Sequence, residues 1–202
     1  MSSAGPPNAP ESGPAATRAG YEVKAAALRG YIGEIEKLGV LPAVLEKVEP
    51  ETRRAIESPP LPSAWIDAIL VEDMIGALES ILGPKAVRTV TSAGQRTGAA
   101  RFLIPVAAAL FRLFGAKPDT LLGRFSEVTK TAIRGVQFKW TSESPTSGCL
   151  AVTFPRKHVP RHVFIGMESG CWLTIELCKL NGKVAETEIV NDGTTGVIRV
   201  SW

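Results

Sequence analysis

Apolar residues recur at steps of three and four through the first two thirds of the chain, which is the spacing of one face of an α-helix. The clearest run covers 65–82 and contains Trp65, Ile69, Leu70, Met74, Leu78, Ile81 and Leu82. Gly83-Pro84 follows this run, and proline fits the first turn of a helix, so a second helix is predicted over 85–100. Gly94 and Gly98 leave one face of that helix without side chains, which favours close helix packing.

Shorter helices are predicted on either side of this pair. One begins at Tyr21 and stops near Gly39, and two more follow Pro42 and Glu49 before the prolines of 58–62 interrupt the pattern. After the pair, the segment 102–114 is apolar nearly all round, which is typical of a helix surrounded by other elements. We expect it to be the central helix, followed by another helix over 120–133.

The period changes from 3.6 to 2 after Gly135, which predicts β-strands. Two strands fall near 136–140 and 149–154, joined by a polar connection. A helix over 161–180 follows, and then two strands over 185–190 and 196–202, joined through an Asp-Gly turn signal. The predicted fold class is therefore α+β: an N-terminal helical half followed by β-β-α-β-β with a four-stranded antiparallel sheet.

Composition sets the domain organisation and excludes several classes of function. Residues 1–20 are rich in Ser, Ala, Gly and Pro and are predicted to be a disordered tail, which leaves 21–202 as a single α+β domain. The net charge of +3 is too small to indicate a nucleic-acid partner. The chain contains no apolar run long enough for a transmembrane segment and no secretory signal pattern. Three cysteines without a C-x-x-C pair favour reduced thiols, so we expect a cytoplasmic protein.

Several segments resemble a family of about 200 residues, found as paralogues in myxobacteria, whose members have no assigned biochemical function. The residues that carry this resemblance lie in three places: Gly30-Tyr31-Ile32, Leu61-Pro62-Ser63-Ala64-Trp65, and the strand pair Glu188-Ile189-Val190 and Val197-Ile198-Arg199-Val200-Ser201-Trp202. That family is in turn distantly similar to the haem-NO-binding, 4-vinyl-reductase-like and transport-particle (TRAPP-like) subunit domains. The resemblance implies a helical half followed by a four-stranded antiparallel sheet.

The resemblance also implies where a function would lie. In that superfamily, either the space between helices and sheet holds a ligand or the helical face is an assembly surface. Haem-binding relatives use a histidine on a helix, whereas this chain has no histidine before His158. Related members often carry cysteines near the last hairpin, where this chain has Val190 and Gly196. We therefore expect no cofactor and no metal or thiol site at that hairpin.

The candidate polar site is a basic segment at the start of the predicted helix over 161–180. Arg156, Lys157, Arg161 and His162 lie near a predicted helix N-terminus, where backbone N–H groups and the helix dipole favour an anion. The structural alternative is a basic, solvated loop. His158 and His162 are four residues apart, but Pro160 interrupts a helix between them and no Asp or Cys completes a metal site.

The motif-like segments of the sequence each lack a residue that a catalytic motif requires. The segment Gly166-Met167-Glu168-Ser169-Gly170 has Glu where a nucleophile elbow needs Ser, so its glycines are interpreted as small residues on a helix that packs against the sheet. Gly94-Gln95-Arg96-Thr97-Gly98 lacks the Lys-Ser/Thr of a phosphate loop. Cys171 and Cys178 are expected in the core as small hydrophobes.

The sequence thus favours a protein that binds rather than catalyses. The leading hypothesis is a non-enzymatic adaptor or regulatory domain that binds a protein partner, with a homodimer as one form. The alternative is a sensor of an apolar small molecule, with a cavity between the helices and the sheet lined by Phe102, Val106, Leu110 and Phe114. Close helix packing is the competing interpretation of those four residues.

Overall fold

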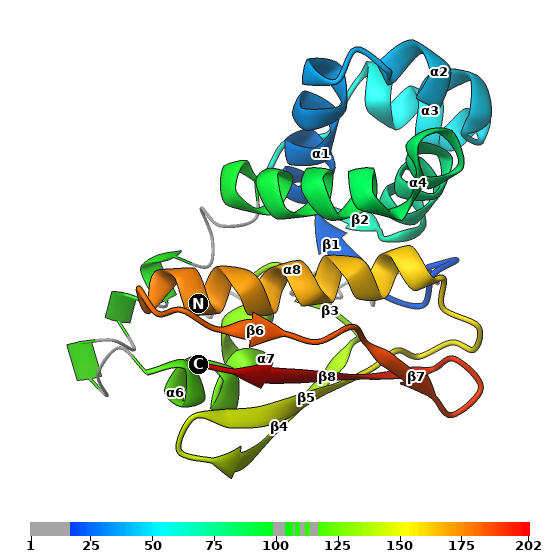
Figure 1. The fold of residues 1–202 in the computed structure, drawn as a ribbon. Coiled ribbons are helices and arrows are strands. Elements are labelled where there is room, and N and C mark those ends of the chain that lie inside the picture. Colours follow the sequence, from blue (N-terminus) through cyan, green and yellow to red (C-terminus); the bar gives the residue numbers. More distant parts are fainter. Residues whose placement is uncertain (1–16, 99–103, 107, 110–111, 114–116) are drawn as a thin grey trace, which may run out of the picture.

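Three layers build the protein: a group of helices, one long helix, and an antiparallel sheet (Figure 1). The computed structural model describes residues 17–98, 104–106, 108–109, 112–113 and 117–202. The helix that forms the middle layer by itself is α8 (Arg161–Leu177), and it lies between the other two layers. Helices precede strands along the chain, so the predicted α+β fold is confirmed.

The helical layer consists of α1 (Ala25–Lys37), α2 (Leu41–Lys47), α3 (Pro50–Glu57) and α4 (Ile69–Thr97). Helix α4 contains the predicted break, because Gly83 has φ 77° and ψ 177° and Pro84 restarts the helix directly after it. A positive φ of this kind suits glycine, which has no Cβ to clash with the backbone. The break bends α4 so that its second half can lie along α8 while its first half stays with α2 and α3.

Glycines bring α1 and α4 together. A Cβ on Gly30 would lie 2.4 Å from the carbonyl oxygen of Gly94, and a Cβ on Gly98 would lie 2.2 Å from that of Ala26. Tyr31 covers Gly94 from the side, with its ring where a Gly94 side chain would be. The close packing predicted from Gly94 and Gly98 is confirmed.

A small sheet, missed by the sequence pattern, lies between the layers. It has the order β2-β1-β3, with β1 (Glu22–Lys24), β2 (Trp65–Asp67) and β3 (Ile133–Arg134) all antiparallel. The predicted helices were therefore begun too early, at Tyr21 and Trp65. Strands of two or three residues are too short to show a period of 2, and their partners are distant in sequence.

Two residues assigned to the predicted tail, Arg18 and Ala19, are held against the rest of the chain. Ala19 is fully buried, and the backbone N–H groups of Arg18 and Ala19 donate to the carboxylate of Asp67 at 2.5 and 3.1 Å. A carboxylate that is distant in the sequence therefore fixes these two residues, whereas residues 1–16 of the predicted tail lie outside the described residues.

Two short helices replace the single helix predicted over 120–133. They are α6 (Pro118–Gly123) and α7 (Phe125–Thr129), separated at Arg124, whose φ of −108° and ψ of 16° lie outside the helical range. The chain then enters β3. Of the predicted central helix, 102–114, the structure describes residues 104–106, 108–109 and 112–113, where Ile104 and Leu113 are exposed rather than surrounded by other elements.

The main sheet has four rows. Its order is β4 (Gln137–Ser144), β5 (Ser147–Thr153), β8 (Thr195–Ser201) and β6 (Lys183–Val184). Strand β7 (Glu188–Val190) also pairs with β8. It pairs with the first three residues of β8, whereas β6 pairs with the last two residues of β8. Because β5 pairs along the whole of β8, β6 and β7 share the other edge as one interrupted strand. The four-stranded antiparallel prediction is confirmed.

The β4–β5 connection is shorter than predicted. Pairing continues to Ser144 and Ser147, so the turn is Pro145-Thr146 and the polar residues 142–148 belong mostly to strands. The polar character of these strand ends reflects exposure of β4, whose residues are exposed or half-buried throughout.

Helix α8 packs on the sheet through large apolar side chains. Phe164 is fully buried, meets Phe154 edge to face at 5.4 Å, and lies over Gly196 of β8. Any Cβ at position 196 would lie 2.4 Å from the Phe164 ring. The sheet thus accommodates α8 at a point where one strand has no side chain.

We expect two glycines of α1 to respond oppositely to alanine. Gly30→Ala would force its Cβ into the Gly94 carbonyl and should destabilise the protein by about 1–3 kcal/mol. Gly33 has open space around it, so Gly33→Ala should stabilise by about 0.5–1 kcal/mol through helix propensity. Thermal unfolding followed by circular dichroism measures both, and shifts of the same sign would contradict the α1–α4 packing described here.

Candidate functional site

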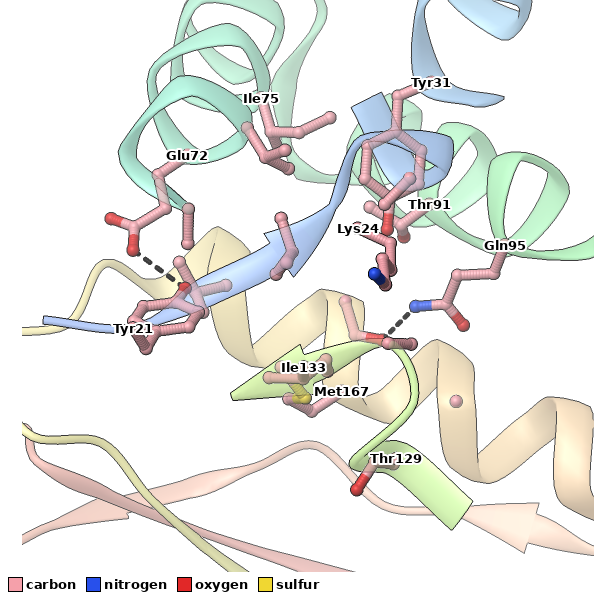
Figure 2. A pocket seen from close by; sticks show the side chains of 18 of the residues that line it. Tyr21, Lys24, Tyr31, Glu72, Ile75, Thr91, Gln95, Thr129, Ile133 and Met167 are labelled. Atoms are coloured by element: carbon pink, nitrogen blue, oxygen red, sulfur yellow. Dashed lines mark hydrogen bonds between the residues drawn. The ribbon is translucent and has the colours of Figure 1, made fainter. Parts of the chain in front are cut away.

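A cavity of about 120 Å³ lies where the helical layer meets α8. Its walls come from β1, α1 and α4 on one side and from β3, α7 and α8 on the other (Figure 2). Most of the lining groups are apolar or small: Val23, Ala27, Ala68, Val71, Ile75, Phe125, Ala132, Ile133, Val163, Gly166, Met167 and Gly170. Lys24 also lines it, but its ammonium reaches the Ser63 carbonyl at 2.6 Å and the Trp65 ring, so only its aliphatic stem faces the cavity.

One end of the cavity is closed by a buried polar group. The Tyr21 hydroxyl donates to Oε1 of Glu72 at 2.8 Å, and the other carboxylate oxygen of Glu72 pairs with Arg156. Burial raises the pKa of Tyr21 well above its ordinary value, and the nearby Glu72 charge raises it further. Tyr21 is therefore a neutral hydrogen-bond donor at this end of the cavity.

Tyr31 and Gln95 lie at the other end (Figure 2). The Gln95 amide donates to the carbonyl oxygen of Gly166 at 2.7 Å, which ties α4 to α8. Burial raises the pKa of Tyr31, and a hydrogen bond with Gln95 offsets part of that rise. The Tyr31 hydroxyl is thus also neutral, so the cavity carries polar groups at two ends and apolar walls between them.

The glycines of α8 have a different role from the one predicted. Gly166 and Gly170 line the cavity rather than the sheet interface, and a Cβ on Gly166 would meet nothing within 4 Å. They lie on the face of α8 toward α4 and α7, opposite the face that carries Phe164 onto the sheet. The interpretation that they let α8 approach the sheet is wrong, because Gly166 faces empty space and Gly170 faces Phe125 and Gln95.

The basic residues of 156–162 do not form one cluster. Arg156 pairs with Glu72, and Lys157 pairs with Asp192 at 3.1 Å. Arg161 pairs with Glu168 at 2.8 Å and Glu186 at 2.9 Å, while His162 Nδ1 lies 3.1 Å from a Glu79 oxygen. Each side chain of the candidate anion site thus already faces a carboxylate, and an anion held by all four stays a prediction.

Glu168 is the buried charge that sequence reasoning missed. It is fully buried and accepts hydrogen bonds from Arg88 at 2.5 Å, from Arg161, and from the backbone N–H and hydroxyl of Thr187 at 2.8 and 2.7 Å. Burial alone would raise the pKa of this carboxyl, but the hydrogen bonds from Thr187, Arg161 and Arg88 outweigh burial and lower it. A signal existed in the sequence, since Glu168 interrupts the apolar pattern of α8.

The cysteines agree with the prediction of core residues. Cys171 is fully buried and Cys178 is buried, and all three thiols are free. Burial raises the pKa of Cys171 to about 12 and that of Cys178 to about 11, which makes both poor nucleophiles. Within the described residues, no group of three or more His, Cys, Asp or Glu side chains is placed to hold a metal ion.

The cavity has other walls than those predicted. Val106 is half-buried and does not line the cavity described above, whereas Phe102, Leu110 and Phe114 lie outside the described residues. A contribution of that segment to a ligand site stays a prediction. In the part of the chain that the structure covers, no helix has the length and apolar character needed to cross a bilayer.

Comparison with solved structures places this architecture among H-NOX domains. The Fe(II) unliganded H-NOX protein from K. algicida superposes with a TM-score of 0.64 and 12% identity, over 88% of this chain and 95% of that one. An oxygen-binding H-NOX domain related to soluble guanylate cyclases gives 0.59 and 13%, over 88% and 94%. A structure from a study of haem distortion in the H-NOX family gives 0.62 and 14%, over 89% and 94%. No protein-family model and no curated protein matched the chain.

These likenesses confirm the predicted haem-NO-binding-like fold. They cover nearly nine tenths of this chain, so the helical layer, α8 and the sheet all take part. Membership of the myxobacterial family stays a prediction, as does the similarity to transport-particle subunits.

Haem is the group that this fold implies, and the described residues do not fit it. Ligand pockets of ordinary size occupy about 300–1,000 Å³, whereas this cavity has about 120 Å³. The only histidines of the chain are His158 and His162. His158 lies in a loop and does not line the cavity, and His162 has its ring fixed by Glu79. The cavity lined by the described residues is therefore too small for a porphyrin.

We expect Glu168→Gln to destabilise the protein by about 3 kcal/mol at neutral pH, because it leaves two arginines without their buried partner. Glu176→Gln is the matched control on the same helix, since its ion pair with Arg96 is half exposed and should contribute less than about 1 kcal/mol. Urea unfolding monitored by tryptophan fluorescence measures both.

Comparison of Glu168→Gln with the wild type also tests how the stability of the fold depends on pH. The pKa of Glu168 is lower in the folded protein than the ordinary 4.5, so its carboxylate stabilises the fold above pH 4.5. That contribution is lost as the pH falls through the folded pKa. Glu168→Gln should therefore show a smaller loss of stability below about pH 4.5 than the wild type. Parallel pH profiles would rule out this role of Glu168.

Proposed function

We propose that this domain is a sensor that binds a small apolar molecule in the cavity between its helical layer and α8. The observation that carries the proposal is the empty, mostly apolar space beside Gly166, which two neutral tyrosines border at opposite ends. Small-molecule sites typically combine apolar walls with a few polar groups that orient the ligand. The neighbours of this fold include an oxygen-binding H-NOX domain, which supports ligand sensing as the use of this interior.

Size limits the ligand. An apolar cavity of about 150 Å³ is known to bind benzene or xenon and to stay free of water otherwise. At about 120 Å³ this cavity suits a diatomic gas, a short hydrocarbon or a single aromatic ring, and it excludes lipids and tetrapyrroles unless the layers move apart. The sensor proposed from the sequence is kept, with a much smaller ligand.

Sensing requires that the ligand change something outside its site. The cavity walls belong to two layers, and the layers are joined across it by Gln95 with Gly166 and by Thr91 with Ser169 at 2.9 Å. A ligand that contacts α4 and α8 together adds apolar contacts between them and favours the closed arrangement. The signal would be the strength of the α4–α8 contact.

The first test uses benzene as the probe. We expect the methyl resonances of Ile75 and Met167, which line the cavity, to shift and saturate with a Kd on the order of 1 mM or tighter. Gly166→Leu should abolish these shifts, because its side chain would fill the open space beside α8. Two-dimensional ¹H–¹³C spectra of the folded variants measure the effect.

Gly33→Leu is the control for that substitution. Gly33 is also a helix glycine with nothing within 4 Å of its Cβ position, but it does not line this cavity. Gly33→Leu should bind benzene as the wild type does. Saturable binding that survives Gly166→Leu would place the ligand elsewhere, and absence of any binding by the wild type would refute the proposal.

The adaptor function and the homodimer remain proposals from the sequence. The exposed large apolar residues of the described chain are Leu38, Leu61, Leu82, Ile104, Leu113, Leu180 and Ile189. Their exposure alone does not specify a protein partner, since single exposed apolar residues are normal on monomers.

A further inference from the structure

The Tyr31 hydroxyl is a buried polar group on the wall of the apolar cavity. Its ring comes from α1 and lies against Gly94 of α4, so closely that a Cβ on Gly94 would collide with the ring. Tyr31 is 7% exposed and lines the cavity, and Figure 2 shows its hydroxyl end directed toward the space between α4 and α8. The packing on Gly94 therefore holds this hydroxyl at a fixed place.

Gln95 uses the oxygen of the Tyr31 hydroxyl and leaves its proton free. The Gln95 amide nitrogen donates to the Gly166 carbonyl, whereas Gln95 Oε1 lies 3.8 Å from the Cβ position of Gly170. The amide nitrogen is on the side of Tyr31 in Figure 2. The bond with Gln95 lowers the pKa of Tyr31 against the larger effect of burial, as a donor to a phenol oxygen does. The two amide hydrogens thus serve Gly166 and Tyr31.

The other hydroxyl groups that line the cavity already donate their protons. Their acceptors lie at 2.7 to 2.9 Å: a Glu72 carboxylate oxygen for Tyr21, the Val87 carbonyl for Thr91 and the Phe125 carbonyl for Thr129. Among the residues that the structure describes, the Tyr31 proton has no such acceptor. A buried donor without an acceptor is unfavourable, so a ligand that accepts this proton gains over a hydrocarbon of the same shape.

The rest of the wall requires a neutral ligand. The lining is mostly apolar, and burial of a charge without a partner is strongly unfavourable. The Lys24 ammonium is bound to the Ser63 carbonyl, and Arg156 is paired with Glu72. A carbonyl oxygen accepts a proton without bringing a donor of its own, which would need a further acceptor in these walls.

We propose that the cavity binds a small ketone or aldehyde, with a single ring or a short chain, whose carbonyl oxygen accepts from the Tyr31 hydroxyl. The open space beside Gly166 takes the apolar body of the ligand. This inference rests on the sensor function proposed above and names the class of ligand. Tyr31 is then the residue that distinguishes a carbonyl compound from a hydrocarbon.

Cyclopentanone and methylenecyclopentane test this proposal, because they have nearly the same shape and only the ketone carries an acceptor oxygen. Their Kd values are measured on the full chain from the methyl shifts of Ile75 and Met167. Tyr31→Phe keeps the ring that packs on Gly94 and removes the hydroxyl. We expect it to weaken cyclopentanone about fivefold and to change methylenecyclopentane by less than about twofold. The ratio of the two Kd values, compared between proteins, cancels the difference in hydration of the two probes.

Tyr21→Phe is the matched control. Tyr21 lines the same cavity, but its hydroxyl proton is donated to Glu72, so the ratio of the two Kd values should stay as in the wild type. A ratio that is unchanged in Tyr31→Phe, or that changes equally in both variants, would overturn the choice of ligand and leave the sensor function intact. Absence of methylenecyclopentane and benzene binding by the wild type would refute both.

A measurement on the wild type makes the result independent of how the variants fold. The infrared C=O stretch of bound cyclopentanone should lie at lower frequency than in an alkane solvent, because a hydrogen bond to the oxygen weakens the double bond. A stretch of the bound ketone at its alkane position would overturn the proposal.

Discussion

The rest of the structure depends on the way α8 is held on both sides at once. One face carries Phe164 onto the sheet, and the opposite face meets α4 through hydrogen bonds and small residues. Glu168 joins three parts of the chain at this helix, since Arg88 belongs to α4, Arg161 to α8 and Thr187 to the segment before β7. A fully buried carboxylate is tolerated only when its oxygens are satisfied, and here four donors satisfy them.

The α4–α8 contact also contains a set of small polar side chains. Beside the apolar side chains that both helices bury in the core, this contact includes hydrogen bonds of Thr91, Ser92 and Gln95 with Ser169 and the Gly166 carbonyl. Small polar side chains bond across the contact without filling the space beside them. The apolar cavity is therefore a consequence of how the layers are joined, and it lies directly beside the bonds that join them.

The sequence predicted the parts of this fold that depend on local periodicity. The break at Gly83, the glycine packing of α1 on α4 and the four rows of the main sheet all follow from spacing or from glycine geometry. The small β2-β1-β3 sheet does not, because each strand has two or three residues and pairs with segments more than 40 residues away. Because of those strand pairings, α1 and α4 begin later in the chain than predicted, and Asp67 of β2 also holds the backbone of Ala19.

The candidate sites were predictable only in part, for a related reason. The residues 156–162 were identified correctly as unusual, but their partners Glu72, Glu79 and Asp192 lie far away in the sequence. No spacing rule could separate Arg156 and His162, which border a cleft, from Lys157 and Arg161, which do not. Gly166 was likewise noticed but assigned to the wrong face of α8.

The contrast between fold and interior has a physical explanation. Helices, α8 and sheet superpose on H-NOX domains over nearly nine tenths of the chain at 12–15% identity, so the architecture tolerates almost complete replacement of its side chains. A core that keeps its total volume and its apolar pattern keeps its fold. The size of the ligand that fits inside is not kept constant in this way, because a few side chains determine the cavity volume. In this chain Tyr31, Ile75 and Met167 line the space between the layers and leave about 120 Å³, so similar layers enclose a cavity too small for a haem.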